Sequence, residues 1–301
     1  MKITRLSISP YQNTDFSEKE KVALSNFEKN GLPGEILITN TLTDISAIDP
    51  KQIKLIIHPN SGYDNFPVDF VQKADFPIVI GNEIRAQAVC EYILFCLFKR
   101  FGEFPNQNIW DRKLKNRFLL KEKNILIIGQ GHIGKLLKTS LQGLVKEIFA
   151  VDPFVEEAAK SLDEVPLKNC DVVILCASLN PTSYHLVNQE FLEKLPNNFT
   201  LINPARGDLI DQEDLLKYLK INPSSFAFLD VFNEEPNKME FSGITNLFTT
   251  SHIAGVFENL DDNIIDFERK VLHDFIHRPL EFSQIYKNSI LKNRIKDNFL
   301  V

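Results

Sequence analysis

An apolar segment that ends in a glycine-rich turn constrains the fold of this chain more than any other feature. The segment Ile125–Ile128 runs into Gly129, Gly131 and Gly134, which are spaced as G-x-G-x-x-G, and a second apolar run ends at Asp152. A buried parallel strand, a tight turn, a helix and a second strand that ends in a carboxylate give this pattern. The segment therefore predicts a βαβ unit that binds a dinucleotide.

Each residue of this turn has its own expected role. Gly129 permits the turn, Gly131 lets a pyrophosphate approach the backbone, and Gly134 lets the helix pack on the strand. The helix N-terminus attracts the anion. Asp152 is expected to accept hydrogen bonds from the adenosine ribose, which favours NAD because a ribose 2′-phosphate would meet a like charge. A methyltransferase-type nucleotide site uses a similar turn and remains the alternative for this segment taken alone.

Composition limits the class of protein. The chain has 301 residues, of which 44% are hydrophobic and 25% charged, so it is long enough for two hydrophobic cores. Its net charge of −6 and the lack of a basic block argue against a nucleic-acid partner. We expect no transmembrane helix and no signal peptide. The cysteines form no C-x-x-C pair, which predicts reduced thiols and a cytoplasmic protein; they are Cys90, Cys96, Cys170 and Cys176.

Two sets of strand-like segments alternate with helix-like stretches. The first set is Lys2–Ser9, Ile36–Thr39, Lys54–His58 and Ile78–Ile80; the second is Asn124–Ile128, Ile148–Val151, Val172–Leu175, Leu201–Asn203, Ser225–Leu229 and Leu247–Thr249. Compact apolar runs of this kind are typical of parallel sheets that are covered on both faces. We therefore predict an α/β fold of two doubly wound parallel-sheet domains, a Rossmann nucleotide domain and a smaller flavodoxin-like substrate domain.

Two helices are expected to join these domains. Ala86–Phe101 is apolar on nearly every side, which predicts a buried helix, and Asn259–Ile276 is amphipathic. If the second helix returns the chain to the first domain, the tail belongs there as well. The predicted substrate domain is then 1–102 with 279–301, the predicted NAD-binding domain is 103–278, and we expect the active site between them.

An arginine, a carboxylate and a histidine follow three successive strand ends of the second set. Arg206 comes after Leu201–Asn203, Glu235 lies in the segment after Ser225–Leu229, and His252 comes after Leu247–Thr249. Strands of a doubly wound sheet end at the ligand crevice. A histidine can move a hydroxyl proton, a carboxylate can hold and charge the histidine, and an arginine can polarise a carbonyl. These residue types are what a hydride-transfer enzyme requires.

At this point the sequence resembles the D-isomer-specific 2-hydroxyacid dehydrogenase family. The motifs that carry the resemblance occur in the family's order: Ser61-Gly62-Tyr63-Asp64-Asn65, Ala88-Val89-Cys90-Glu91, the glycine turn, the long signature from Asp171 to Asn188, and the blocks of Arg206, Glu235 and His252. The resemblance implies an NAD-dependent oxidoreductase that acts on a 2-hydroxy or 2-oxo acid. It also implies a homodimer formed through the nucleotide domain, with no nucleic-acid or membrane partner.

The resemblance carries roles to individual positions. Arg206, Glu235 and His252 take the catalytic roles, and backbone amides near Ser61 and Gly62 bind the substrate carboxylate. The implied cofactor-binding residues are Gly129, Gly131, His132, Ile133, Gly134, Asp152, Ala177, Pro204, Ala205, Asp230 and Gly255. Asp230 is expected to hold the carboxamide, and no metal site is expected.

The chain departs from the family pattern in places. The segment between Asp152 and Asp171 is short, so an edge element is expected to be missing, and Pro59-Asn60 replaces a glycine-rich stretch. Arg85 is an open case: it is either a solvated helix end or a ligand for a second acidic group of the substrate. His58 matches no motif and is interpreted as structural. A non-enzymatic, NAD-responsive binding protein or co-repressor on the same scaffold is the alternative function.

Overall fold

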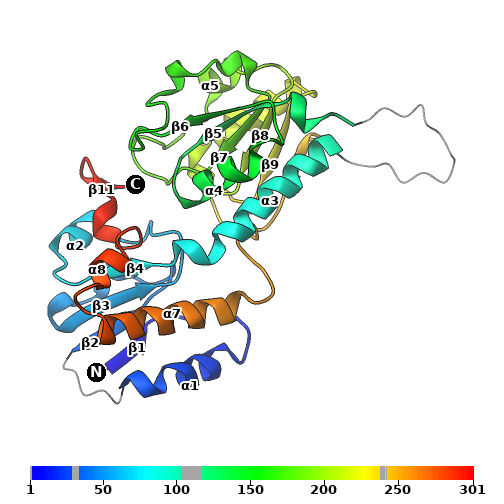
Figure 1. Ribbon diagram of the computed structural model, residues 1–301. Helices are drawn as coiled ribbons and strands as arrows, with labels where there is room; N and C mark the ends of the chain where they lie inside the picture. Colours follow the sequence, from blue (N-terminus) through cyan, green and yellow to red (C-terminus); the bar gives the residue numbers. More distant parts are fainter. Residues whose placement is uncertain (1, 29–33, 103–116, 238–240, 242) are drawn as a thin grey trace. The chain divides into compact units, whose positions relative to one another are not determined.

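The computed structural model describes residues 2–28, 34–102, 117–237, 241 and 243–301 of the chain. The chain divides into two compact units (Figure 1). The first unit is Met1–Arg85 with Val256–Val301, and the second is Ala86–Gly255. The α/β fold with two parallel sheets is confirmed, because one sheet has four strands and the other has six.

The first unit is built on the four-stranded sheet. Its strands are β1 (Lys2–Arg5), β2 (Glu35–Ile38), β3 (Ile53–His58) and β4 (Ile78–Ile80), all parallel and in the order β1-β2-β3-β4. This order has no reversal among the described strands. The first strand also ends at Arg5 rather than at Ser9.

Both faces of this sheet are nevertheless covered. Alternate strand residues point to opposite faces. One face packs on α1 (Phe16–Glu28), α7 (Leu260–His277) and α8 (Phe282–Ile285), and the other packs on α2 (Val68–Lys73) and the C-terminal segment. That segment includes a small antiparallel pair, β11 (Ile295–Lys296) and β12 (Phe299–Leu300). Because α7 returns beside α1 from late in the chain, both faces are buried without a reversal of strand order.

The second unit is built on the six-stranded parallel sheet, in the order β10-β9-β8-β7-β5-β6. The strands are β5 (Asn124–Ile128), β6 (Glu147–Val151), β7 (Val172–Leu175), β8 (Thr200–Asn203), β9 (Phe226–Leu229) and β10 (Leu247–Thr249). Because β6 and β7 flank β5 on opposite sides, the order reverses at β5, as in a Rossmann sheet. β6 is the edge strand, and beyond it only the isolated bridge from Val151 to Ala159 is formed, which agrees with the missing element expected there.

Helices cover both faces of this second sheet. One face packs on α3 (Asn82–Gly102) and α4 (His132–Leu141), and the other packs on α5 (Gln189–Glu193) and α6 (Gln212–Ile221). The residues of the inner strands β5, β7, β8 and β9 are almost completely buried, which explains why the sequence shows continuous apolar runs there instead of alternation.

The two long helices do not divide as the predicted domain boundaries require. The buried side chains of α3 from Val89 to Phe101 pack on the second sheet, and those of α7 pack on the first. Residues 86–102 therefore belong to the second unit and residues 256–278 to the first. The expected boundary at residue 103 itself falls just outside the described residues.

Helix α3 is not buried all round, contrary to the prediction. Phe95 is 54% exposed and Phe98 is 50% exposed, whereas Cys90, Ile93, Cys96 and Leu97 are fully buried. The sequence could not show this difference, because the exposed and buried faces carry the same residue types. The cysteines are free thiols, three of them buried and Cys176 half-buried. Within the described part of the chain, no helix is long and apolar enough to cross a membrane.

Candidate functional site

The glycine turn lies between the carboxyl end of β5 and the start of α4. Gly129 has a φ of +97°, in the region that favours glycine, and a Cβ atom there would lie 2.5 Å from the backbone of Cys176 and Ala177 at the end of β7. A Cβ atom on Gly134 would lie 2.0 Å from the carbonyl oxygen of Gly129. Both glycines are therefore required for the backbone to pack in this way.

Gly131 is different, because nothing lies within 4 Å of the Cβ position there and its φ is −70°. The fold itself would accept a side chain at this position. Gly131 is also the N-cap of α4 and supplies no capping side chain. Open space over a helix N-terminus fits a bound pyrophosphate, which needs close approach to the backbone. His132 and Ile133, which follow, begin that helix.

The difference between Gly131 and Gly134 predicts that alanine at these two positions affects stability and cofactor binding differently. Gly131→Ala should leave the free energy of unfolding nearly unchanged but weaken NADH binding, because the new methyl group occupies the space left for the phosphates. Gly134→Ala should lower the free energy of unfolding by about 1–3 kcal/mol or more, because its methyl group meets backbone. Chemical denaturation and NADH titration of both variants measure the two effects. Equal destabilisation by both substitutions, or unweakened NADH binding by Gly131→Ala, would contradict this assignment.

Asp152 directly follows β6 and is half-buried. Its two carboxylate oxygens accept hydrogen bonds from the backbone N–H groups of Gln130 at 2.8 Å and Phe154 at 2.9 Å. These bonds tie the end of β6 to the glycine turn. A carboxylate has about four lone-pair positions, so two remain for ribose hydroxyl groups.

Hydrogen bonds within the segment after β8 fix the backbone around Arg206 and one nitrogen of its side chain. The Asn203 side chain accepts from Ala205 N at 3.0 Å and donates to Arg206 O at 2.8 Å, and Arg206 Nη1 donates to Ala205 O at 2.7 Å. Pro204, which lies within this turn, is buried. The expected nicotinamide contacts of Pro204, Ala205 and Ala177 remain predictions, although all three lie at carboxyl ends of β7 and β8.

The segments after β8, β9 and β10 are joined to one another. A Cβ atom on Gly207 would lie 2.0 Å from the backbone of Phe232, so these two loops touch through backbone atoms. Asn233 Nδ2 donates to Asp208 Oδ1 at 2.7 Å. The sheet therefore brings the arginine-bearing loop against the glutamate-bearing loop.

Glu235 and His252 form a direct pair. His252 Nδ1 lies 2.6 Å from Glu235 Oε2, and the other oxygen, Oε1, accepts from Phe232 N at 3.1 Å. Because a carboxylate oxygen accepts, the proton lies on Nδ1 and the neutral ring leaves Nε2 as its proton acceptor. The imidazole is 55% exposed, so Nε2 is accessible to a small molecule. This is the arrangement of a general acid–base histidine with an orienting carboxylate.

The backbone at His252 is strained and is held in place by Asp230. His252 has a φ of +56°, which is uncommon for a residue with a side chain. Asp230 is fully buried; its carbonyl accepts from His252 N, and its carboxylate accepts from Ile253 N and Ala254 N, each at 2.8 Å. Strained residues fixed by such contacts cluster at functional sites. The carboxamide contact expected of Asp230 stays a prediction.

Sequence reasoning missed two residues of this support. Thr250 Oγ1 donates to Asp230 Oδ1 at 2.6 Å, and Tyr92 OH on α3 lies 2.8 Å from Thr250 Oγ1. Thr250 lies in the same strand-end segment as His252, which was a usable signal. Tyr92 carried none, because its neighbours on α3 are nearly all apolar. Gly255 ends the second unit just beyond this segment, and its cofactor contact remains a prediction.

The expected substrate loop lies in the first unit, directly after β3. His58 is fully buried; its Nε2 donates to Gly62 O at 2.7 Å, and its Nδ1 accepts from Thr39 Oγ1 at 2.9 Å. Burial lowers the pKa of His58 to about 4, although the bond to Gly62 opposes the shift. The neutral ring therefore fixes the loop, in agreement with the structural interpretation of His58. In the trans peptide between Gly62 and Tyr63, the N–H group of Tyr63 points in the opposite direction to the Gly62 carbonyl. Because that carbonyl faces His58, the N–H group of Tyr63 points away from His58.

Arg85 lies in the first turn of α3 and is half-buried. Its Nη1 donates to Pro59 O at 2.7 Å, so it contacts the start of the same loop as Ser61 and Gly62. Arg85 is therefore not the solvated helix end that was one of the two alternatives.

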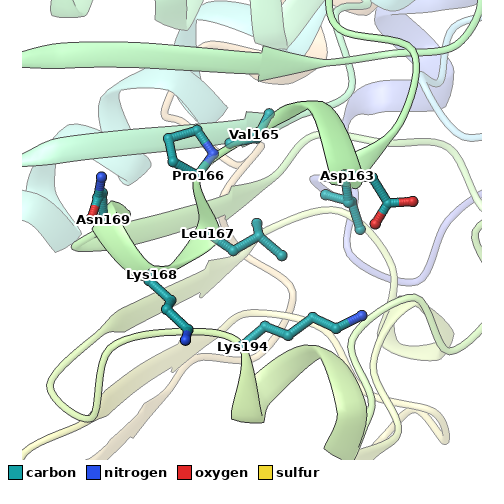
Figure 2. A pocket seen from close by; sticks show the side chains of 8 residues that line it. Asp163, Val165, Pro166, Leu167, Lys168, Asn169 and Lys194 are labelled. Carbon is teal, nitrogen blue, oxygen red and sulfur yellow. The ribbon is translucent and has the colours of Figure 1, made fainter.

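A shallow hollow in the second unit lies apart from these residues (Figure 2). It is lined by residues of two short 3₁₀ segments, Leu162–Glu164 and Leu167–Asn169, and by Lys194. Because the second 3₁₀ segment precedes β7, the hollow lies at the amino end of that strand and not at the carboxyl ends that carry the site. Within the described ranges, no group of His, Cys, Asp or Glu side chains could hold a metal ion.

Comparison with known proteins decides the family. Residues 97–254 match the family model of the "D-isomer specific 2-hydroxyacid dehydrogenase, NAD binding domain". The chain belongs to the D-isomer specific 2-hydroxyacid dehydrogenase family. The matched residues include the glycine turn, Asp152, Arg206, Glu235 and His252, all in the second unit. The prediction of an NAD-binding domain from the glycine turn and Asp152 is therefore confirmed.

Members and structural neighbours of this family resemble most of the chain. The chain is 30% identical over 237 residues to erythronate-4-phosphate dehydrogenase of Wigglesworthia glossinidia brevipalpis. This match covers 75% of the chain and 58% of that protein. It is 29% identical over 226 residues to (S)-sulfolactate dehydrogenase of Chromohalobacter salexigens, a match that covers 67% of the chain and 71% of that protein. The fold matches the structure of D-lactate dehydrogenase of Aquifex aeolicus with a TM-score of 0.72 at 20% sequence identity. This match covers 91% of the chain and 96% of that structure. The chain thus spans less than two thirds of the first of these relatives.

Proposed function

We propose that the chain is an NAD-dependent D-2-hydroxyacid dehydrogenase that interconverts a 2-hydroxy acid and a 2-oxo acid. The observation that carries the proposal is the Glu235–His252 pair, formed at the carboxyl ends of an NAD-binding sheet. A binding protein that only senses NAD has no need for an accessible imidazole nitrogen held by a carboxylate. Family membership supports the same reaction class.

The residues divide the work between binding and proton transfer. When bound, the nicotinamide supplies the hydride chemistry at C2. In oxidation His252 Nε2 takes the hydroxyl proton, and in reduction it returns that proton to the carbonyl oxygen. Glu235 keeps the proton on Nδ1, so Nε2 is the nitrogen that exchanges the substrate proton. Arg206 binds the substrate carboxylate and polarises the C2 oxygen, which fixes the reacting geometry.

Each unit has proposed binding residues of its own. The open space at Gly131 and the amides of His132 and Ile133 take the pyrophosphate, and Asp152 takes the ribose. In the first unit, amides of the loop at Ser61 and Gly62 take the substrate carboxylate. The turnover of 2-oxo acids by the full chain with NADH tests the proposal. No NADH consumption with any acid, together with tight NADH binding, would instead favour the NAD-responsive binding protein.

We further propose that the chain forms a homodimer through the nucleotide unit. This is supported by an exposed apolar group at one end of the unit: Phe95 and Phe98 on α3, with Phe118 and Leu119, are 50–60% exposed. Phe118 N donates to Phe101 O, so this segment lies against the end of α3. Sedimentation analysis of the full chain measures its mass, and a monomer at all concentrations would contradict the dimer. A cytoplasmic location fits the free cysteines.

A further inference from the structure

Two segments of the first unit pack closely enough to place their polar groups together. These are the loop after β3, from His58 to Gly62, and the start of α3, from Gly81 to Arg85. Gly81 N donates to His58 O at 2.8 Å and to Asn60 O at 3.1 Å. A Cβ atom on Gly81 would lie 2.8 Å from the backbone of Pro59, so only glycine permits this approach.

Two polar side-chain groups where these segments meet lack hydrogen-bond partners. Ser61 Oγ and Asn82 Nδ2 are buried atoms without a hydrogen-bond partner, and Asn82 as a whole is 6% exposed. A buried donor without an acceptor costs free energy, and a bound ligand that supplies an acceptor removes that cost. Two such atoms on facing segments indicate that an acceptor binds between them.

Arg85 adds positive charge at the same place. Its Nη1 is bound to Pro59 O, but in the described ranges it has no ion pair with a carboxylate. Burial lowers the pKa of Arg85 to about 10, and the charge of Asp261 partly opposes this shift. A half-buried guanidinium that has only one carbonyl partner retains donors suited to an oxyanion.

We propose that Ser61, Asn82 and Arg85 form a subsite for the second anionic group, a phosphate or distal carboxylate, of a 2-hydroxy or 2-oxo acid. This subsite rests on the proposed function and names its substrate class. It lies wholly in the first unit. The loop amides near Gly62 take the C1 carboxylate in the proposed function, so the subsite is next to the place where the acid itself binds.

Matched substrate pairs test the subsite. Hydroxypyruvate with 3-phosphohydroxypyruvate, and 2-oxopentanoate with 2-oxoglutarate, differ within each pair by the second anion. The wild-type chain should have a higher kcat/KM for the dianionic member of at least one pair. In Arg85→Ala this ratio should fall by about 10–100-fold, the loss typical of a charged hydrogen-bonded contact. The phosphate and carboxylate pairs show which anion the subsite accepts.

Two controls keep the test decisive. Arg269→Ala removes an exposed arginine of α7 in the same unit, paired only with Asp266, and should leave the ratio unchanged. If Arg85→Ala does not fold, Arg85→Lys keeps the charge without the planar fork and should lower the ratio by a smaller factor. A ratio that is unchanged in both Arg85 variants would overturn the subsite.

A direct binding measurement separates this inference from the proposed function. Inorganic phosphate should bind the wild-type full chain, measured by calorimetry, and should bind Arg85→Ala at least about 10-fold more weakly. If hydroxypyruvate is reduced but neither anionic partner is preferred, the subsite is wrong and the dehydrogenase function stands. If no acid is reduced, the proposed function fails. Phosphate binding that is equal in wild type and Arg85→Ala would then overturn the subsite as well.

Discussion

Replacement of His252 by alanine should lower turnover of 2-oxo acids by about 10²–10⁴-fold, the usual contribution of general acid–base catalysis. The imidazole is the group whose free Nε2 can exchange a proton with the C2 oxygen, since Nδ1 is bound to Glu235. NADH affinity should change little, because the glycine turn and Asp152 follow β5 and β6, at the opposite end of the strand order from β10 and the His252 loop. Steady-state kinetics with NADH, together with NADH titration by fluorescence, measure both quantities.

The chain offers a matched control for this experiment. His185 also lies in the second unit, has a φ of +48°, and pairs with a carboxylate, Asp211, at 3.5 Å. His185→Ala should therefore keep wild-type turnover if the effect at His252 is chemical and not a general cost of losing such a pair. Wild-type turnover in His252→Ala, or an equal loss in both variants, would refute the catalytic assignment.

NADH should be preferred over NADPH by about 5–150-fold in kcat/KM, equivalent to about 1–3 kcal/mol of charge conflict. The cause is the Asp152 carboxylate at the end of β6, which would face the 2′-phosphate of NADPH. Its backbone bonds to Gln130 and Phe154 hold it in place, so it cannot easily turn away. No lysine or arginine follows directly to compensate, since the next residues are Pro153-Phe154-Val155-Glu156-Glu157.

Asp152→Asn should narrow this preference, because the amide removes the charge but can still accept a backbone hydrogen bond. Glu156→Gln is the charge-matched control, as Glu156 is an exposed carboxylate of the same loop, and it should keep the wild-type preference. Thermal unfolding of each variant shows whether the loop has kept its structure. Equal kcat/KM for both cofactors in the wild-type chain would show that Asp152 does not contact the ribose.

The strands and the order of the site residues could be predicted from the sequence. Strands buried on both faces appear as short continuous apolar runs, and β4, β5 and β7 lie where those runs predicted them. Because parallel strands present their carboxyl ends at one edge, Arg206, Glu235 and His252 could be assigned to neighbouring loops. The contact between Glu235 and His252 depends on the backbone geometry of these loops. The sequence indicates that geometry only through the positions of glycines and strand ends.

Features that depend on long-range packing could not be predicted in the same way. Asp230 holds the backbone of the histidine loop, but its sequence context does not show that its carboxylate points at Ile253 and Ala254. Helix α3 could not be assigned to a unit, since an apolar helix can pack on either sheet. The packing of Gly81 on Pro59 likewise joins segments that show no shared pattern in the sequence.

Hydride transfer itself can be followed with an isotopically labelled cofactor. The full chain is incubated with NADH deuterated at C4 of the nicotinamide and with a panel of 2-oxo acids, and the products are analysed by chiral chromatography and mass spectrometry. We expect a D-2-hydroxy acid that carries one deuterium at C2 when the transferred position of C4 is labelled. Binding of the cofactor without any deuterated hydroxy acid from the whole panel would contradict the assignment as a dehydrogenase.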